Sequence, residues 1–175
     1  MDALTAELLA ARDGDRFALH AVLRMVHPDL WRYAAAVAGV DLADDIAQDT
    51  LIRIWKALPA YRGECPARPW ILSIARRAIA DAQRQRARWA RLVDRLVHDR
   101  SGAASPVSDH AEAHRIHAMI GDLDVAMRDA FVLTAVVGCT YEEAAQICDV
   151  AVGTIRSRVA RSRAALARDL HVRSA

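Results

Sequence analysis

The sequence contains few cysteine, proline, glycine and phenylalanine residues. Among 175 residues there are three cysteines, five prolines, seven glycines and two phenylalanines. The cysteines are odd in number and show no C-x-x-C spacing, which argues against a disulfide framework and against a cysteine zinc site. A reducing cytoplasm is therefore the expected location.

Long apolar runs and familiar catalytic motifs are also absent. No uncharged apolar stretch approaches the ~18 residues of a membrane span. The acidic, amphipathic start MDALTAELLAARDGD is not expected to be a secretory signal. The sequence has no Walker P-loop, G-x-G-x-x-G, H-E-x-x-H or G-x-S-x-G motif, so we expect no enzymatic activity, no cofactor and no metal.

The charges are segregated along the chain, although the net charge is only +2. Residues 1–58 carry six basic and nine acidic residues, whereas residues 59–100 carry ten and four. Residues 101–150 carry two basic and eight acidic residues, and residues 151–175 carry six and one. Two separated basic blocks suit two contacts on one polyanion, although chance clustering on solvated helices would give the same pattern.

Helical periodicity dominates the sequence, and strand-type alternation is absent. Asp41 is expected to cap a helix, and three prolines within 59–69 predict a loop. The polar segment Asp99 to Asp109 is the best domain break. The fold class is therefore all-α, with two helical domains joined by a flexible linker. Helices are expected near 2–12, 16–38, 41–58, 68–89, 110–121, 125–137 and 141–148, and from Val152 onward.

The segment TYEEAAQICDVAVGTIRSRV has the length and pattern of a helix-turn-helix. Thr140 and Glu143 have the spacing of a capping box for its first helix. In the second helix, Val152, Ile155 and Val159 fall on one stripe, which predicts the buried face.

The opposite side of this second helix is small and basic. Gly153, Ser157 and Ala160 form an outward ridge, with arginines on both sides and no acid between Val152 and Leu166. A ridge of this kind suits insertion into the DNA major groove, where arginine binds guanine edges or phosphates. A basic surface helix that contacts nothing is the alternative.

Both halves of the chain resemble bacterial sigma factors of the extracytoplasmic-function (ECF) group of the sigma-70 family. TYEEAAQICDVAVGTIRSRVARSRAAL is similar to their recognition domain for the minus-thirty-five element. DLADDIAQDTLIRIWKALPAYRG and RPWILSIARRAIADAQRQRAR are similar to their polymerase-binding and minus-ten helices. Asp149 stands where the family usually has glycine, and Ala151 where it usually has a capping serine.

The resemblance implies a region two domain at 1–91, a linker at 92–109 and a region four domain at 110–175. It implies partners: the beta-prime and beta subunits of core RNA polymerase, double-stranded and melted promoter DNA, and an anti-sigma factor, with no membrane insertion. The implied polymerase-binding residues are Asp45, Gln48, Asp49, Ile52 and Arg53. The implied minus-ten residues are Tyr61, Arg62, Glu64, Arg68, Arg76, Arg77, Arg84 and Arg88. The implied minus-thirty-five residues are Thr154, Arg156, Ser157, Arg158, Arg161 and Arg163.

Other interpretations remain open at this point. His110, His114 and His117 have a spacing that could bind a metal, but no cysteine lies nearby, so a surface or partner contact is favoured. Cys65 could be a redox-sensitive thiol, and Trp70 is more consistent with the core than with a base contact. A dimeric helix-turn-helix regulator and a helical enzyme or RNA-binding protein are the rival functions.

Overall fold

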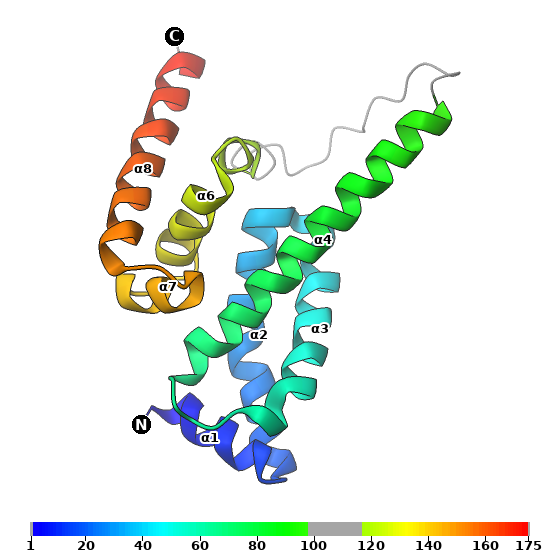
Figure 1. Cartoon of the computed structure of the whole chain (residues 1–175), viewed down its shortest axis with the longest axis vertical. Coiled ribbons are helices and arrows are strands. Elements are labelled where there is room, and N and C mark those ends of the chain that lie inside the picture. Colours follow the sequence, from blue (N-terminus) through cyan, green and yellow to red (C-terminus); the bar gives the residue numbers. More distant parts are fainter. Residues whose placement is uncertain (1, 98–116, 175) are drawn as a thin grey trace.

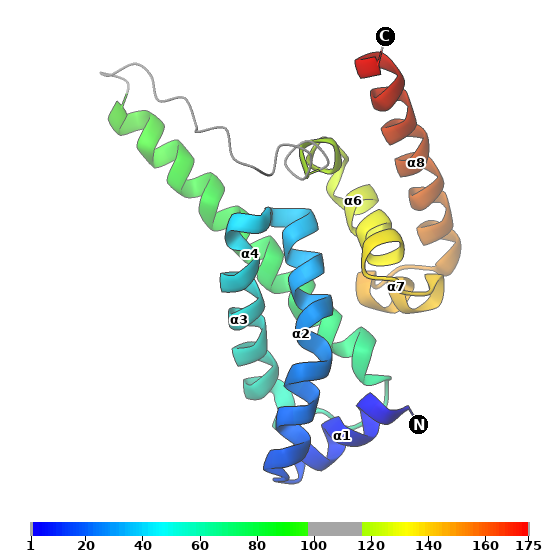
Figure 2. The same ribbon diagram turned by 180° about the vertical axis from the view of Figure 1, so that it is seen from behind.

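The computed structural model describes residues 2–97 and 117–174, and every regular element in these ranges is helical, which confirms the all-α prediction. The N-terminal half contains α1 (Ala3–Arg12), α2 (Arg16–Ala38), α3 (Val40–Ala57), the 3-10 turn η1 (Leu58–Ala60) and α4 (Ala67–Val97). Figures 1 and 2 show α2, α3 and α4 side by side, with α1 across one end. The helix α4 continues six residues beyond the predicted domain boundary at 91.

Aspartates begin the first two helices. The Asp2 carboxylate accepts a hydrogen bond from the Thr5 backbone N–H at 2.9 Å, and Asp15 accepts from the N–H groups of Phe17 and Ala18. These bonds satisfy donors that a helix N-terminus otherwise leaves unpaired. The predicted helices 2–12 and 16–38 are thus confirmed almost to the residue.

The start of α3 differs from the prediction. Gly39, rather than Asp41, is the N-cap residue, and it makes no side-chain capping bond. Its φ of +98° favours glycine, and a β-carbon there would lie 3.6 Å from the Nε2 of His117. Asp41 instead lies in the first turn, where its negative charge interacts favourably with the helix dipole.

The C-terminal half comprises a helical turn at 117–121, then α6 (Val125–Phe131), η2 (Val132–Val136), α7 (Tyr141–Cys148) and α8 (Val152–Ser174). Asp124 caps α6 by accepting a hydrogen bond from the Ala126 N–H at 3.0 Å. The expected single helix 125–137 is instead divided, because η2 is π-helical. The first part of the expected helix 110–121, with His110 and His114, lies outside the described residues.

Buried apolar side chains from both halves form one continuous cluster. The helices α2 and α4 pack against each other, and they also contact η2 and α7 respectively (Figure 1). Trp70 packs partly buried against this cluster, in line with the prediction that it belongs to the core. The spacing of Trp55 from Leu51 and Leu58 predicts a position on the core face of α3, but this prediction is wrong, because Trp55 is 60% exposed.

Candidate functional site

The helix-turn-helix begins with the predicted capping box. The Glu143 backbone N–H donates to Thr140 Oγ1 at 3.1 Å, and the Thr140 N–H donates to Glu143 Oε2 at 2.8 Å. Each side chain thus satisfies the backbone donor of the other, which fixes the start of α7.

The turn between α7 and α8 passes through Asp149 in the left-handed conformation, at φ 54° and ψ 54°. Asp149 is the one non-glycine residue with positive φ in the described ranges. Aspartate adopts this conformation at a lower energetic cost than most residues do, so the turn forms where the family usually has glycine. The Val150 N–H then donates to the Ala145 carbonyl at 3.1 Å and closes the turn.

The two faces of α8 are those that the sequence predicts. Ile155, Val159 and Ser162 are buried, and the Ser162 hydroxyl donates to the Met127 carbonyl of α6 at 3.0 Å. Gly153 and Ser157 are exposed on the other side. None of the four arginines between Val152 and Leu166 forms an ion pair within the described residues, so their charges are available to a partner. Three of them are exposed, namely Arg156, Arg161 and Arg163. The side chains of Thr154 and Arg158 are half-buried.

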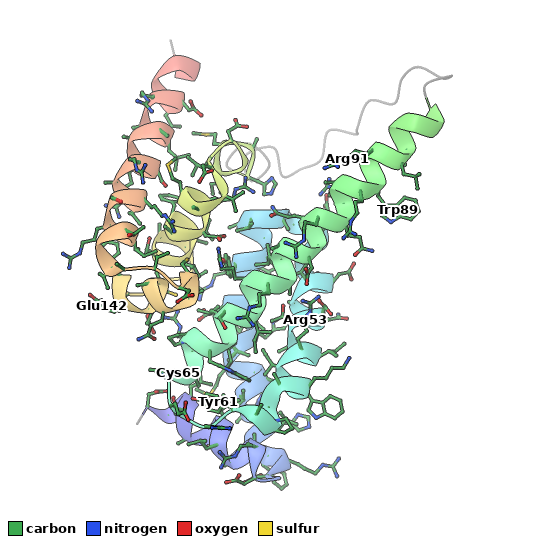
Figure 3. All side chains as sticks on the ribbon, viewed as in Figure 1. Arg53, Tyr61, Cys65, Trp89, Arg91 and Glu142 are labelled. Atoms are coloured by element: carbon green, nitrogen blue, oxygen red, sulfur yellow. The ribbon has the colours of Figure 1, made fainter. Side chains whose placement is uncertain are left out.

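The loop between η1 and α4 encloses a small pocket of about 250 Å³. Tyr61 is nearly buried, donates to the Cys65 carbonyl at 2.6 Å and packs on Trp70 with ring centroids 4.8 Å apart. Burial raises the pKa of the Tyr61 hydroxyl. Arg62 and Glu64 are exposed at the rim, where their charged atoms are 3.9 Å apart. The pocket is therefore lined by two aromatic side chains and by two charged ones. Figure 3 labels Tyr61 and Cys65 of this loop.

Two of the arginines predicted to bind the minus-ten element contact the C-terminal half. Arg68 donates to the Val137 carbonyl at 2.8 Å and pairs with Glu143 at 3.3 Å, while also binding Asp29 of α2. Arg76 pairs with Asp129 of α6 at 2.6 Å. The sequence did not predict these contacts, because nothing local indicates which distant carboxylate meets α4.

Asp129 is a buried carboxylate at this junction and is only 7% exposed. Besides Arg76, it accepts a hydrogen bond from the hydroxyl of Tyr33 at 3.3 Å. Burial, with the nearby Asp129 charge as a second cause, raises the pKa of Tyr33 well above its usual range. A buried charge held by a cation and a hydroxyl fixes how α6 sits on α2 and α4.

The remaining predicted minus-ten cations lie on the outer part of α4. Arg77, Arg84 and Arg88 are exposed, and Arg77 has no hydrogen bond or ion pair within the described residues. Arg84 pairs with Asp81, and Arg88 donates to the Arg84 carbonyl at 3.3 Å. This face of α4 therefore presents positive charge to a partner.

The helix α3 exposes the predicted polymerase-binding surface. Ile52 is 51% exposed among exposed polar neighbours, and Trp55, one turn further along, extends the apolar surface. Its i, i+3 spacing from Ile52 was the signal that could have identified Trp55. The other predicted members, Asp45, Gln48 and Asp49, are exposed, and Arg53 is half-buried.

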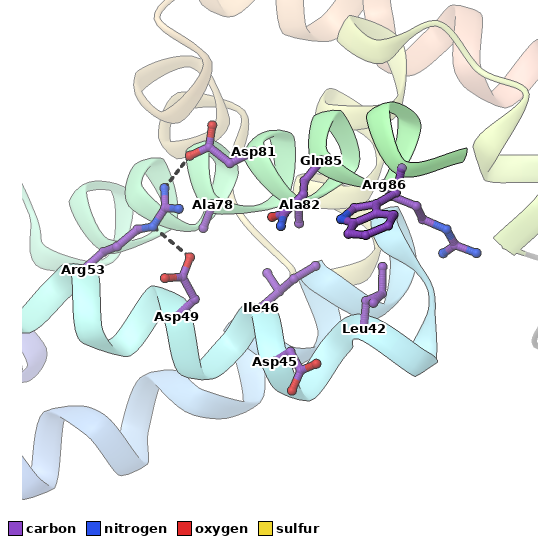
Figure 4. A pocket seen from close by; sticks show the side chains of 11 residues that line it. Leu42, Asp45, Ile46, Asp49, Arg53, Ala78, Asp81, Ala82, Gln85 and Arg86 are labelled. Carbon is purple, nitrogen blue, oxygen red and sulfur yellow. Dashed lines mark hydrogen bonds and ion pairs between the residues drawn. The ribbon is translucent and has the colours of Figure 1, made fainter. Parts of the chain in front are cut away.

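A groove of about 510 Å³ runs between α3 and α4 beside this surface (Figure 4). Arg53 bridges it, because its guanidinium binds Asp49 at 2.8 Å and Asp81 of α4 at 2.6 Å. The hydrogen bond from Arg53 is the main reason that the pKa of Asp81 is lowered. Trp89, which sequence reasoning missed, lines the groove and is largely exposed.

Two of the three cysteine thiols are buried, which lowers their reactivity. Burial raises the pKa of Cys139 to about 12 and that of Cys148 to about 11. Cys65 is exposed in the loop. Within the described ranges no group of histidine, cysteine and carboxylate side chains could hold a metal ion.

A helix-turn-helix with unpaired arginines and a second helix with an exposed apolar patch are together typical of a DNA-binding protein that docks on another protein. The family model for sigma-70 region 2 matches residues 22–90, and that for sigma-70 region 4 matches residues 113–166. The chain belongs to the ECF group of the sigma-70 family. It is therefore a transcription initiation factor that brings core RNA polymerase to promoters.

The relatives cover nearly the whole chain. The ECF sigma factor SigC of Mycobacterium tuberculosis (strain CDC 1551 / Oshkosh) is 38% identical over 96% of this chain and 91% of its own length. EcfG of Rhodopseudomonas palustris (strain TIE-1) is 32% identical, over 83% of this chain and 81% of its own length.

Two solved structures share the fold. CnrH, in complex with the cytosolic domain of CnrY, is 25% identical with a TM-score of 0.78, over 98% of this chain and 99% of that one. RpoE of Bartonella quintana, in complex with the anti-sigma factor NepR, is 31% identical with a TM-score of 0.68, over 86% of this chain and 94% of that one.

Proposed function

We propose that three surfaces of this initiation factor divide its work, with α8 binding the minus-thirty-five element. The observation that carries this assignment is the ridge of small residues on α8 with unpaired arginines beside it. The guanidinium group of arginine can donate two hydrogen bonds to a guanine edge in the major groove or to a phosphate, and small residues let the helix approach the bases. The residues assigned to this contact are Thr154, Arg156, Ser157, Arg158, Arg161 and Arg163.

The loop and α4 are assigned to the minus-ten element. The loop pocket of about 250 Å³ has Tyr61, Trp70 and Glu64 among its lining residues. Extruded bases are held by stacking and by hydrogen bonds to their edges, while cations track the backbone. Four arginines are placed to contact the phosphate backbone of the DNA: Arg62, Arg77, Arg84 and Arg88. Two more, Arg68 and Arg76, can contact it once their ion pairs with the C-terminal half are broken.

Core polymerase is assigned to the exposed face of α3. An apolar centre with a polar rim is typical of an interface hot spot. Ile52 and Trp55 form this centre, and Asp45, Gln48, Asp49 and Arg53 surround it. The family resemblance identifies the partner as the beta-prime subunit, with beta nearby.

An anti-sigma factor is the proposed regulator, because both structural relatives were solved with a bound partner, and one of these partners is named as an anti-sigma factor. The protein would act in the cytoplasm, where polymerase and promoters are, and would do no covalent chemistry itself. No helix in the described ranges is long and apolar enough to cross a membrane. The proposed domains are 1–91, the linker 92–109 and 110–175.

Promoter binding with and without core polymerase tests this proposal. The chain with core polymerase should retain specific fragments from a randomised promoter library in a gel-shift assay, and the chain alone should retain few. Retained fragments should share two elements at one fixed separation. Specific binding of duplex DNA by a dimer of the chain alone, unchanged by polymerase, would instead support the rival regulator.

A further inference from the structure

A cleft of about 330 Å³ lies between α6, α2 and α4, and four of its ten lining residues are arginines. Figure 1 shows α6 beside these two helices. Arg76, Arg77 and Arg84 come from α4, and Arg128 comes from α6. Asp129 is the one acidic residue among the lining residues, so four positive charges face one negative charge.

The single carboxylate does not neutralise the cleft. Asp129 is already bound by the Arg76 Nε and by the Tyr33 hydroxyl. The guanidinium of Arg77 has no partner within the described residues, and Arg84 pairs only with Asp81, which does not line the cleft. One unpaired guanidinium and an excess of positive charge around a concave site favour a bound anion.

Arg128 is the cation that α6 contributes to this cleft. Its Nη2 donates to the carbonyls of Gly121 at 2.8 Å and Leu123 at 3.1 Å, which holds the guanidinium in place. Its Nε is buried and has no hydrogen-bond acceptor within the described residues. A buried donor without an acceptor costs free energy, so Arg128 carries an unsatisfied donor beside the cleft.

The shape and the remaining walls suggest the class of anion. Val37, Ile79 and Val125 contribute apolar surface beside the arginines. Planar guanidinium groups bind phosphate oxygens in pairs, and several of them together match a diphosphate better than a single carboxylate. We propose that this cleft binds a small phosphate-bearing anion, namely a diphosphate group, either free or carried by a nucleotide.

Such a ligand would contact both halves of the protein, because Arg77 and Arg128 lie on opposite sides of the junction. It would therefore stabilise the packed arrangement, and it would occupy arginines of α4 that face outward. The inference does not rest on the promoter assignment, since diphosphate binding can be measured without DNA or polymerase.

Calorimetric titration with inorganic pyrophosphate at constant ionic strength tests this site. The intact chain should bind one equivalent saturably. Arg77→Gln and Arg128→Gln should each weaken binding by about tenfold or more, the effect of losing a charge-assisted hydrogen bond. Arg91→Gln is the matched control, because Arg91 is exposed on the same helix but does not line the cleft (Figure 3). It should change the affinity less than about twofold.

Two further arms complete the experiment. Tighter binding of ADP or GDP than of pyrophosphate would identify a nucleotide ligand, and equal binding would show that the phosphates alone are recognised. If Arg128→Gln unfolds, Arg77→Gln still tests the site, because the Arg77 side chain makes no hydrogen bond or ion pair within the described residues. Absence of saturable pyrophosphate binding, or equal weakening by Arg91→Gln, would overturn the proposal and leave these arginines as general polyanion contacts.

Discussion

At the residue scale, Asp149 shows how a departure from the family pattern is tolerated. Its backbone is left-handed, and its carboxylate lies at the C-terminal end of α7, where the helix dipole disfavours negative charge. Both effects raise the free energy of the folded turn without changing its geometry.

Asp149→Gly should therefore stabilise the C-terminal half by about 1 kcal/mol, because glycine adopts this conformation without steric cost. Asp149→Ala removes the charge but keeps a β-carbon, and it should be less stable than the glycine variant. Urea unfolding followed by circular dichroism measures both. A glycine variant less stable than the parent would show that the aspartate side chain has a favourable role in the turn.

The three thiols should differ sharply in reactivity. In the native protein an aromatic disulfide reagent should label Cys65 rapidly, and Cys139 and Cys148 only after denaturant is added, because burial favours their neutral thiols. Their raised pKa values mean that the folded state holds protons that the unfolded state releases. The contribution of both thiols to stability is therefore complete below about pH 9 and is lost as pH rises toward 11 to 12. Rapid labelling of all three in the native state would contradict this account.

At the element scale, the spacing of apolar residues predicted the buried and exposed faces of most helices, and it missed the features that depend on tertiary contacts. The exposed patch of α3 and the two faces of α8 follow from a 3.6-residue period. Trp55 was misplaced because its spacing also suits the core face and large aromatic side chains are usually mostly buried; its i, i+3 spacing from the exposed Ile52 was the one local sign of its exposure. Asp81 and Asp129 were missed because their arginine partners are far away in sequence.

The α3 surface gives a prediction with a matched control. Ile52→Asp should weaken binding to core polymerase by about 2 kcal/mol or more, roughly thirtyfold, without loss of folding, since the side chain is half-exposed. Phe17→Asp should leave the affinity unchanged, because Phe17 is 88% exposed on α2 and is not among the residues assigned to polymerase binding. Fluorescence anisotropy with labelled protein measures the affinity of both variants for core polymerase. An equal loss of affinity in the two variants would show that the docking surface is not on α3.

The recognition helix gives a second prediction at this scale. Arg158→Ala should cost about 1–3 kcal/mol at a cognate promoter if Arg158 contacts a base. Binding to a promoter with that base pair changed should fall much less. An equal loss on every sequence would identify a phosphate contact instead. Competition binding of the polymerase complex to the two promoters provides the comparison.

At the scale of the whole molecule, the two helical halves share a buried core and a charged junction. The sequence does not indicate this packing of one half on the other, because each half also has the pattern of a helical domain that folds by itself. In this arrangement Arg68 and Arg76 are occupied by Glu143 and Asp129. The halves must therefore separate before these arginines can contact promoter DNA.

Asp129→Asn should weaken this junction by about 1–2 kcal/mol, because the amide keeps a polar contact to Tyr33 but loses the charge that binds Arg76. Energy transfer between dyes on α3 and α8 should fall in the free protein. Asp13→Asn, which removes an exposed charge in α1's C-cap, should leave it unchanged. Unchanged transfer in the Asp129 variant would show that apolar packing alone holds the halves together.

Run-off transcription with purified core polymerase tests the central claim most directly. Adding the chain should produce transcripts that begin at defined positions downstream of promoters bound in the gel-shift assay, and Ile52→Asp and Arg158→Ala should each reduce them. Phe17→Asp should not. Initiation that is absent on every promoter tested, or that is unaffected by the α3 and α8 variants, would contradict the assignment of these surfaces.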